Sequence, residues 1–158
     1  MATIVDAVLL CVVLLPLYSG SRAETYYVDP GKGSPANDGS PAKPWRTLQE
    51  VVASGLIETR TWDTLPYHPG ASLEVRNPGA PVGAGDTLLL FDGYHGEVLI
   101  RSAYNRKPIT IMPAQDQAAR LGRLHVVAAA RWVLKGLSIS PRHAPDYTRG
   151  GIVRVASH

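Results

Sequence analysis

The chain has 158 residues, of which 45% are hydrophobic and 18% charged, and its formal net charge is +3 at pH 7. This composition is typical of a globular protein and excludes a wholly disordered chain, although 15 glycines and 13 prolines predict many turns. The 16 lysines and arginines form no continuous basic run and no zinc-ligand spacing is present, so nucleic acid is not an expected partner.

Residues 1–23 have the features of a signal peptide. Residues 7–17 form an apolar run of eleven residues, too short to span a bilayer but suited to the central region of a signal peptide. Small residues at the positions that a signal peptidase reads place the cleavage after Ala23. A buried, uncleaved strand or helix is the alternative, because the first residues contain no Lys or Arg and include Asp6. Cleavage predicts a secreted protein, extracellular or periplasmic, with no membrane association and without Cys11, its sole cysteine.

The mature chain is expected to begin with a short strand and a long loop. Residues 25–28 are strong β-formers, and residues 29–44 contain four prolines and three glycines, which is typical of a turn-rich loop. Asp29, Asn37 and Asp38 carry oxygen atoms of the kind that ligate Ca²⁺. Such side chains in turns more often bond their own backbone, and we favour that interpretation.

A short capped helix follows this loop. Thr47 and Glu50 have the spacing of a capping box, in which the threonine hydroxyl accepts from the first turn and the glutamate reaches back. The apolar side chains that form one stripe on this helix are Leu48, Val51 and Val52. We expect about two turns that end near Gly55 and that shield the open end of a stack of strands.

Residues 57–83 form a proline-rich excursion whose length indicates either a functional or a mobile loop. A short strand is expected at residues 72–76. Asp63 and His68 are residue types used in acid–base chemistry. Nothing in the sequence places them near each other, so we interpret them as surface residues of the loop.

One strand pattern recurs in residues 84–158. Aligning Leu90, Ile111, Leu134 and Val155 gives spacings of 21, 23 and 21 residues. Periods in the twenties predict a solenoid in which each repeat buries its apolar face against its neighbours. Alternating apolar and polar residues within the strands indicate that one face of each is buried. The pattern therefore predicts the first coils of a parallel β-helix.

Three basic side chains on the predicted strands are expected to face outward, and two of them are candidates for a binding surface. We expect His125 to face outward between buried neighbours. Lys135 and Arg154 are cations that could line a groove for an acidic polymer. As outward charges they need only keep the strands soluble, and we favour that simpler interpretation.

Five motifs together resemble the amino-terminal part of the pectate-lyase-like superfamily of secreted, right-handed parallel β-helix proteins. They are residues 26–30, 37–49, 84–88, 107–111 and 132–139, in this order. Members of this superfamily include polysaccharide lyases of the alginate lyase and chondroitinase B types. The resemblance implies an all-β solenoid, a right-handed parallel β-helix of about three coils with a short amino-terminal capping helix.

The resemblance also implies what chemistry to expect. Lyases of this fold abstract the proton next to a uronate carboxylate, and they need a cation or Ca²⁺ and a Lys or Arg base. In the family these groups lie on later coils, so we assign no catalytic, cofactor-binding or metal-binding residue to this chain and expect them beyond residue 158. We therefore predict a monomeric segment that binds or acts on acidic polysaccharide, inactive alone, with lyase or glycoside hydrolase activity in a full-length protein.

Two other functions stay open at this point. A non-catalytic β-helix used for adhesion or surface display is the main alternative, since a fold does not by itself determine an activity. A free-standing β-sandwich carbohydrate-binding module would require antiparallel hairpins, which the repeat spacing disfavours. The expected division of the chain is a signal peptide (1–23), a strand, loop and capping helix (24–56), an excursion (57–83) and the first coils (84–158), which lack a carboxy-terminal cap.

Overall fold

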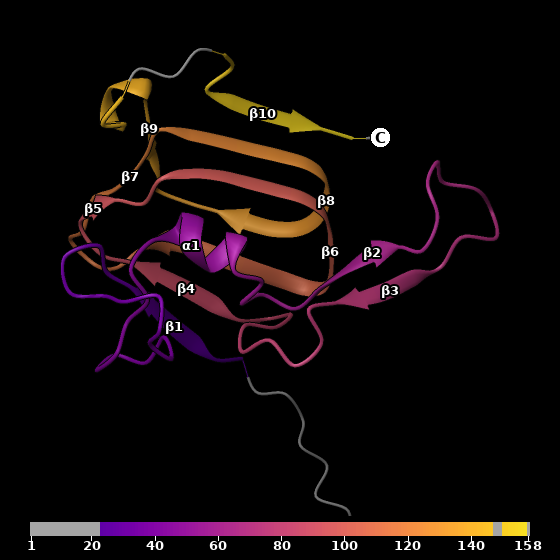
Figure 1. Ribbon diagram of the computed structural model, residues 1–158, viewed down its shortest axis with the longest axis horizontal. Coiled ribbons are helices and arrows are strands. Elements are labelled where there is room, and N and C mark those ends of the chain that lie inside the picture. The colour runs from indigo at the N-terminus through magenta and orange to yellow at the C-terminus, as the bar shows by residue number, and fades with distance from the viewer. Residues whose placement is uncertain (1–22, 147–149, 158) are drawn as a thin grey trace, which may run out of the picture.

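A computed structural model describes residues 23–146 and 150–157 (Figure 1). The predicted signal peptide, including Cys11, lies outside the described residues except for Ala23. The helices are α1 (Leu48–Ala53) and a 3₁₀ turn (Pro141–His143). The strands are β1 (Thr25–Val28), β2 (Thr59–Trp62), β3 (Leu73–Arg76), β4 (Thr87–Leu90), β5 (Gly93–Tyr94), β6 (Glu97–Pro113), β7 (Ala119–Leu121), β8 (Arg123–Leu134), β9 (Ser138–Ile139) and β10 (Val153–Ala156).

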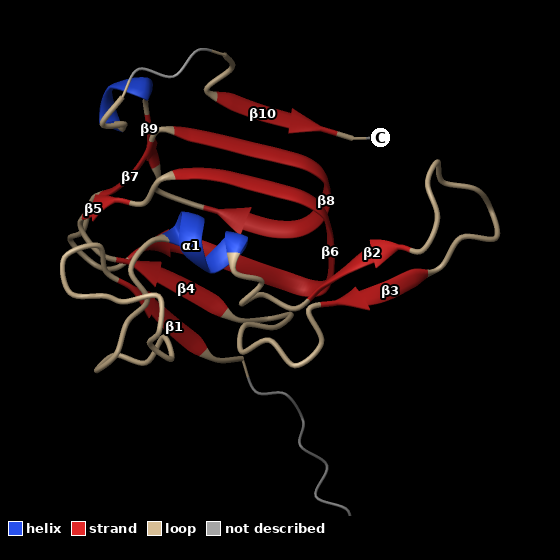
Figure 2. Ribbon diagram, in the orientation of Figure 1, coloured by secondary structure: helices blue, strands red, loops and turns tan. Residues whose placement is uncertain are grey.

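The described chain is mostly β-sheet, and most of its strands are parallel (Figure 2). One sheet has seven strands in the order β1-β4-β6-β2-β3, with β8 beside β6 and β10 beside β8. A smaller sheet has the order β5-β7-β9. The antiparallel pairs between named strands are β2 with β3 and β2 with β6. Parallel neighbours require a long crossover between them, so the chain leaves each sheet and returns to it.

The chain returns to the seven-stranded sheet at a regular interval in β4, β6 and β8. Leu88 lies opposite Ile111, and Ile111 lies opposite Leu134, so the chain comes back after 23 residues each time. The strands that carry Leu90, Ile111 and Leu134 are parallel neighbours, as the sequence predicts. The predicted alignment was nevertheless wrong by two residues, because Leu90 lies opposite Pro113. A shift of two residues keeps every side chain on the same face, so alternation alone could not distinguish the two registers.

The predicted place of Val155 was also wrong. Val155 lies opposite Val126 on β8, and not in line with the stacked residues Leu88, Ile111 and Leu134. The reason is that β6 and β8 are long strands that bend, with a register shift in β6 between Tyr104 and Ile109. Each therefore contributes to two rows of stacked parallel segments: its second half lies in the row of β4, and its first half lies in the row of β10. The strand β10 joins the row formed by the first halves of β6 and β8 (Figure 1).

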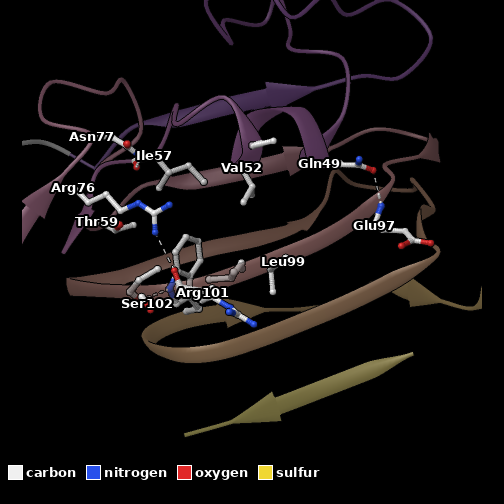
Figure 3. A pocket seen from close by; sticks show the side chains of 14 residues that line it. Gln49, Val52, Ile57, Thr59, Arg76, Asn77, Glu97, Leu99, Arg101 and Ser102 are labelled. Carbon is white, nitrogen blue, oxygen red and sulfur yellow. Dashed lines mark hydrogen bonds between the residues drawn. The ribbon is translucent and has the colours of Figure 1, made fainter. Parts of the chain in front are cut away.

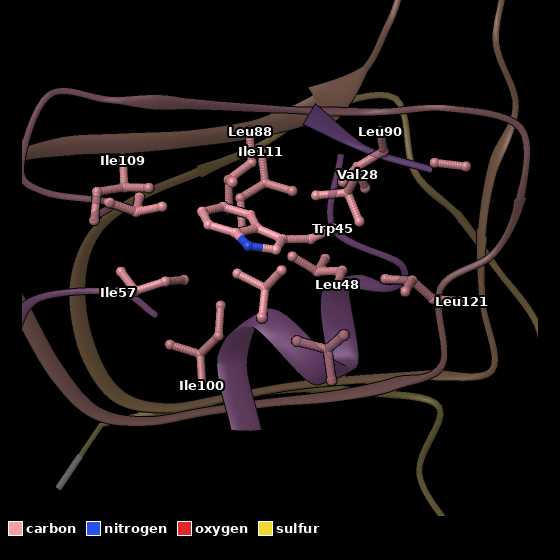
Figure 4. Packing of buried hydrophobic residues seen from close by; sticks show 14 of the residues in the cluster. Val28, Trp45, Leu48, Ile57, Leu88, Leu90, Ile100, Ile109, Ile111 and Leu121 are labelled. Atoms are coloured by element: carbon pink, nitrogen blue, oxygen red, sulfur yellow. The ribbon is translucent and has the colours of Figure 1, made fainter. Parts of the chain in front are cut away.

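Buried apolar side chains from all these rows meet in one core (Figure 4). Members with less than 2% exposure are Val28, Trp45, Leu48, Val51, Val82, Leu88, Leu90, Ile100, Ile109, Ile111, Ala119 and Leu121. The alternation predicted from the sequence is present in the last part of β6, where Ile109 and Ile111 are buried and Thr110 between them is half-buried. Buried residues also alternate with exposed or half-buried ones in β4 and in the first part of β6. Removal of these side chains from water is the main force that holds the strands together.

The predicted helix is present as α1, and its cap has the predicted chemistry. The Thr47 hydroxyl accepts from the Glu50 amide at 3.2 Å. The Glu50 carboxylate pairs with Arg46, and hydrogen bonds from Arg46, then from Thr47, lower its pKa. Leu48 and Val51 are fully buried, so α1 covers the apolar interior beside β6. Figure 4 shows Leu48 and Trp45 among the side chains of the strands.

Residues 57–83 contain a hairpin that the sequence predicted only in part. The strand expected at residues 72–76 is present as β3, whereas its partner β2 was not predicted. Thr59 lies opposite Arg76 at the base of the hairpin, and Arg60 bridges to Tyr104 on β6. The hairpin projects from the body of the protein (Figure 1).

Candidate functional site

The base of the hairpin carries a pocket of about 460 Å³ between α1, β6 and the ends of β2 and β3 (Figure 3). Its lining residues are Gln49, Val52, Ala53, Ile57, Thr59, Arg76, Asn77, Glu97, Leu99, Ile100, Arg101, Ser102, Ala103 and Trp132. Helix α1 supplies one wall, and β6 supplies the other. Ile57, Thr59, Arg76 and Asn77 come from the excursion, so the pocket is complete only because the excursion folds back beside β6.

Two arginines give this pocket a positive charge. A guanidinium nitrogen of Arg76 (Nη1) donates to the carbonyl oxygen of Arg101 at 3.2 Å, which fixes the Arg76 side chain across the end of the pocket. The acidic side chain in the lining, Glu97, lies 3.4 Å from Arg123 on the neighbouring strand. Its charge is therefore largely offset, and a ligand in the pocket meets an excess of guanidinium groups.

A second hollow of about 320 Å³ lies beside the first at the hairpin base. Its lining residues are Glu58, Thr59, Arg60, Val75, Ala84, Tyr104, Asn105 and Arg106. The two hollows share Thr59, so four arginines surround the base of the hairpin. These arginines were not predicted as site residues, because they come from β2, β3 and two points of β6. The available signal was the alternation of apolar and charged residues in Leu73–Arg76, the segment that became β3.

Aromatic rings lie next to these arginines. The ring of Trp62 on β2 lies 5.0 Å from that of Tyr67 and 5.8 Å from that of Tyr104, measured between centroids. Tyr67 is 59% exposed and Leu65 is 57% exposed in the hairpin loop. Arginines beside one exposed and two half-buried aromatic rings suit a ligand that has both a negative charge and a face that can stack on a ring.

The structure brings Asp63 and His68 together, which the sequence did not predict. The Thr64 hydroxyl donates to Asp63 at 2.9 Å and lies 3.0 Å from Nε2 of His68. Because Nδ1 of His68 accepts from the amide of Gly70, Nε2 carries the proton and donates to Thr64. Hydrogen bonds from Ser72, then Thr64, lower the pKa of Asp63. The imidazole cannot take a proton from the hydroxyl in this arrangement, so the network serves to hold the loop.

The basic residues singled out on the strands do not form one groove. Lys135 follows β8, and its amide donates to Ile111 in the row of β4. Arg154 lies on β10 opposite His125, in the other row of the sheet. Both cations are exposed, in keeping with outward charges, and His125 is half-buried with Nε2 2.8 Å from the carbonyl of Gly151.

The side chains considered as Ca²⁺ ligands form hydrogen bonds with the backbone of their own loop. The Asp29 carboxylate accepts from the amides of its own turn at 2.8 and 3.1 Å, and Asp38 accepts from the Ser40 amide at 2.9 Å. The Asn37 amide nitrogen donates to Pro44. Across residues 23–146 and 150–157, no three His, Cys, Asp or Glu side chains are grouped as metal ligands would be.

One buried titratable residue was not predicted. His95 has no exposed surface, and burial lowers its pKa. Its Nε2 donates to the carbonyl of Phe91 at 2.8 Å, while Nδ1 has no hydrogen-bond partner among the described residues. The backbone of His95 accepts from the Gln49 amide, which joins α1 to the start of β6. The neutral imidazole is therefore part of the core beneath α1, away from any solvent-facing site.

Comparison with known proteins adds no relative. No protein-family model matches the sequence, and no curated protein or solved structure matches it either. In the part of the chain that the structure describes, no helix has the length and apolar character needed to cross a bilayer.

Proposed function

We propose that this chain is the amino-terminal part of a secreted, right-handed parallel β-helix protein that binds or acts on acidic polysaccharide. The observation that carries the proposal is the group of four arginines and three aromatic rings around the hairpin base. The order of motifs that resembles the pectate-lyase-like superfamily supports the same conclusion.

The β-helix itself is supported by the path of the chain. Leu88, Ile111 and Leu134 stack in register on parallel strands at a constant separation of 23 residues. Rows in a second direction stack Val98, Leu124 and Val153, and the short strands β5, β7 and β9 form a third row. Helix α1 then occupies the position of an end cap.

The chemistry of the hairpin base fits an acidic sugar polymer. A guanidinium group recognises a carboxylate or a sulfate through parallel N–H bonds, with more directional specificity than an ammonium group. The faces of Trp62, Tyr67 and Tyr104 offer surfaces on which the apolar face of a sugar ring packs. A neutral polymer would leave the arginines without a partner.

Binding is the activity that we assign to these residues, and catalysis is assigned to further coils of a full-length protein. Proton abstraction needs a base of lowered pKa beside a group that neutralises the uronate carboxylate. In such a full-length lyase, Ca²⁺ would supply that neutralisation. The alternative is a non-catalytic β-helix for adhesion or display, which the same arginine surface would serve. Incubation with pectate, alginate and chondroitin, followed by ultraviolet absorbance of unsaturated product, is expected to show no turnover by this chain alone.

Affinity electrophoresis through gels that contain pectate, alginate or chondroitin sulfate tests the binding. We expect retardation that weakens with added salt and that is absent in gels with neutral dextran. The double variant Arg60→Gln/Arg106→Gln should bind the polymers less tightly, whereas Arg142→Gln, at an exposed arginine of the 3₁₀ turn, should behave as wild type. Equal retardation in dextran, or an equal loss in Arg142→Gln, would contradict the proposal.

A further inference from the structure

The pocket beside α1 is built on a strand edge that no other strand of the described residues covers. Residues 97–101 of β6 pair with β8 on one side. On the other side the Glu97 amide donates to Oε1 of Gln49, and the Arg101 carbonyl accepts from Arg76. Backbone groups of a strand in a parallel sheet point alternately to its two sides, so the N–H and C=O of Leu99 also face the pocket. A helix cannot continue the ladder, so these groups remain open to a ligand.

The two side-chain hydrogen bonds stand at opposite ends of this edge (Figure 3). Gln49 reaches β6 from α1, and Arg76 reaches it from β3, so each closes one end of the pocket. The span between Glu97 and Arg101 is four residue steps, roughly 13 Å at about 3.3 Å per residue. That length takes one or two linked sugar rings. A polymer that ran along the strand through both ends of the pocket would collide with the side chains of Gln49 and Arg76.

The lining combines three kinds of group that an acidic sugar uses. Arg76 and Arg101 provide cations for a carboxylate. The backbone of Leu99 and the side chain of Asn77 provide donors and acceptors for hydroxyl groups. Val52, Ile57 and Trp132 provide an apolar wall for the face of a ring.

We infer that this pocket binds the end of an acidic polysaccharide chain, with a terminal uronate carboxylate at Arg76 and Arg101. The inference rests on the proposed function and adds a mode of binding to it. The terminal unit sits between the two closures, and the following units leave over the hairpin base toward Arg60 and Arg106. The protein therefore engages chain ends and not the interior of a polymer.

A uronate disaccharide is the first probe, because it fills the pocket without reaching the rest of the hairpin. Calorimetric titration should show binding to the wild-type chain and about tenfold or more weaker binding to Arg101→Gln. This variant removes the guanidinium but keeps the carbonyl that Arg76 bonds. Leu99→Pro should weaken binding as well, because it removes the N–H that faces the pocket, and proline is tolerated at a strand edge. Arg142→Gln, at an exposed arginine of the 3₁₀ turn that does not line the pocket, is the control and should bind the disaccharide as wild type does.

The second probe is one polyuronate cut to several average lengths and compared at equal mass. If ends are bound, a tenfold shorter polymer should offer about tenfold more binding sites per gram. The double variant Arg60→Gln/Arg106→Gln isolates the pocket and should keep this dependence. Circular dichroism of each variant checks that it is folded.

The failures of the two proposals differ. Sites per gram that do not depend on chain length, or disaccharide binding that is insensitive to both Arg101→Gln and Leu99→Pro, would overturn the chain-end inference while polysaccharide binding stands. Absence of binding to every acidic polymer and to the disaccharide by the wild-type chain would overturn both.

Discussion

Replacement of Ile111 by alanine tests the stacking of the parallel strands most directly. Ile111 is fully buried and lies between Leu88 and Leu134 on the neighbouring strands. The change removes three carbon atoms, and at about 0.8 kcal/mol for each buried methylene the lost transfer free energy is roughly 2.4 kcal/mol. The neighbouring strands cannot close the space fully, so a cavity term adds to it. We expect the free energy of unfolding to fall by about 3 kcal/mol.

Urea unfolding followed by tryptophan fluorescence measures this loss, with Thr110→Ala as the control. Thr110 is the next residue on the same strand, half-buried on the opposite face, between Thr87 and Val133. A change there should alter the free energy of unfolding by less than about 1 kcal/mol. Equal losses in the two variants, or a loss below about 1 kcal/mol for Ile111→Ala, would refute the stacking of Ile111 between its neighbours.

Three further predictions follow from particular contacts. Gly39→Ala and Gly79→Ala each force a positive φ on alanine (78° and 79°). A Cβ at Gly39 would lie 2.8 Å from the buried indole ring of Trp45, whereas a Cβ at Gly79 would meet nothing within 4 Å. Denaturant unfolding should therefore show a loss of about 1 kcal/mol for Gly79→Ala and a clearly larger loss for Gly39→Ala. Burial lowers the pKa of His95 in the folded chain. When the pH falls below the ordinary pKa of histidine, the unfolded chain therefore binds a proton that the folded chain does not, and the free energy of unfolding should fall between about pH 7 and pH 5. His95→Gln should reduce that pH dependence, and a slope equal to that of the wild-type chain would overturn the prediction. Thr47→Ala should lower thermal stability by about 1 kcal/mol through loss of the helix cap, and an unchanged melting temperature would contradict this.

The predicted function depends on surfaces that the sequence could not assemble. Arg60 and Arg76 belong to strands that pair with each other, whereas Arg101 and Arg106 belong to a long strand that starts some twenty residues later. Their proximity follows from the hairpin folding back on β6 through Arg60 and Tyr104. Conversely, Lys135 and Arg154 each lie next to apolar residues of a predicted strand in the sequence, yet the structure places them in different rows of the sheet.

Local chemistry was determined by the sequence itself. The capping box of Thr47 and Glu50 needs only its own four residues, and the turn bonds of Asp29 and Asp38 close within three residues. Alternation at Ile109, Thr110 and Ile111 determined which side chains of the last part of β6 are buried, because the side-chain period of a strand does not depend on its partner.

Tertiary structure alone decided the register and the site. The pairing of Leu88 with Ile111, in place of Leu90, is a two-residue shift that leaves every face unchanged, so only packing against the other rows distinguishes the two. The bends that place the halves of β6 in different rows, and the edge of β6 left open beside α1, likewise arise from contacts between residues far apart in the chain. Such contacts leave no periodic signal in the sequence, and they are the ones that form the pocket.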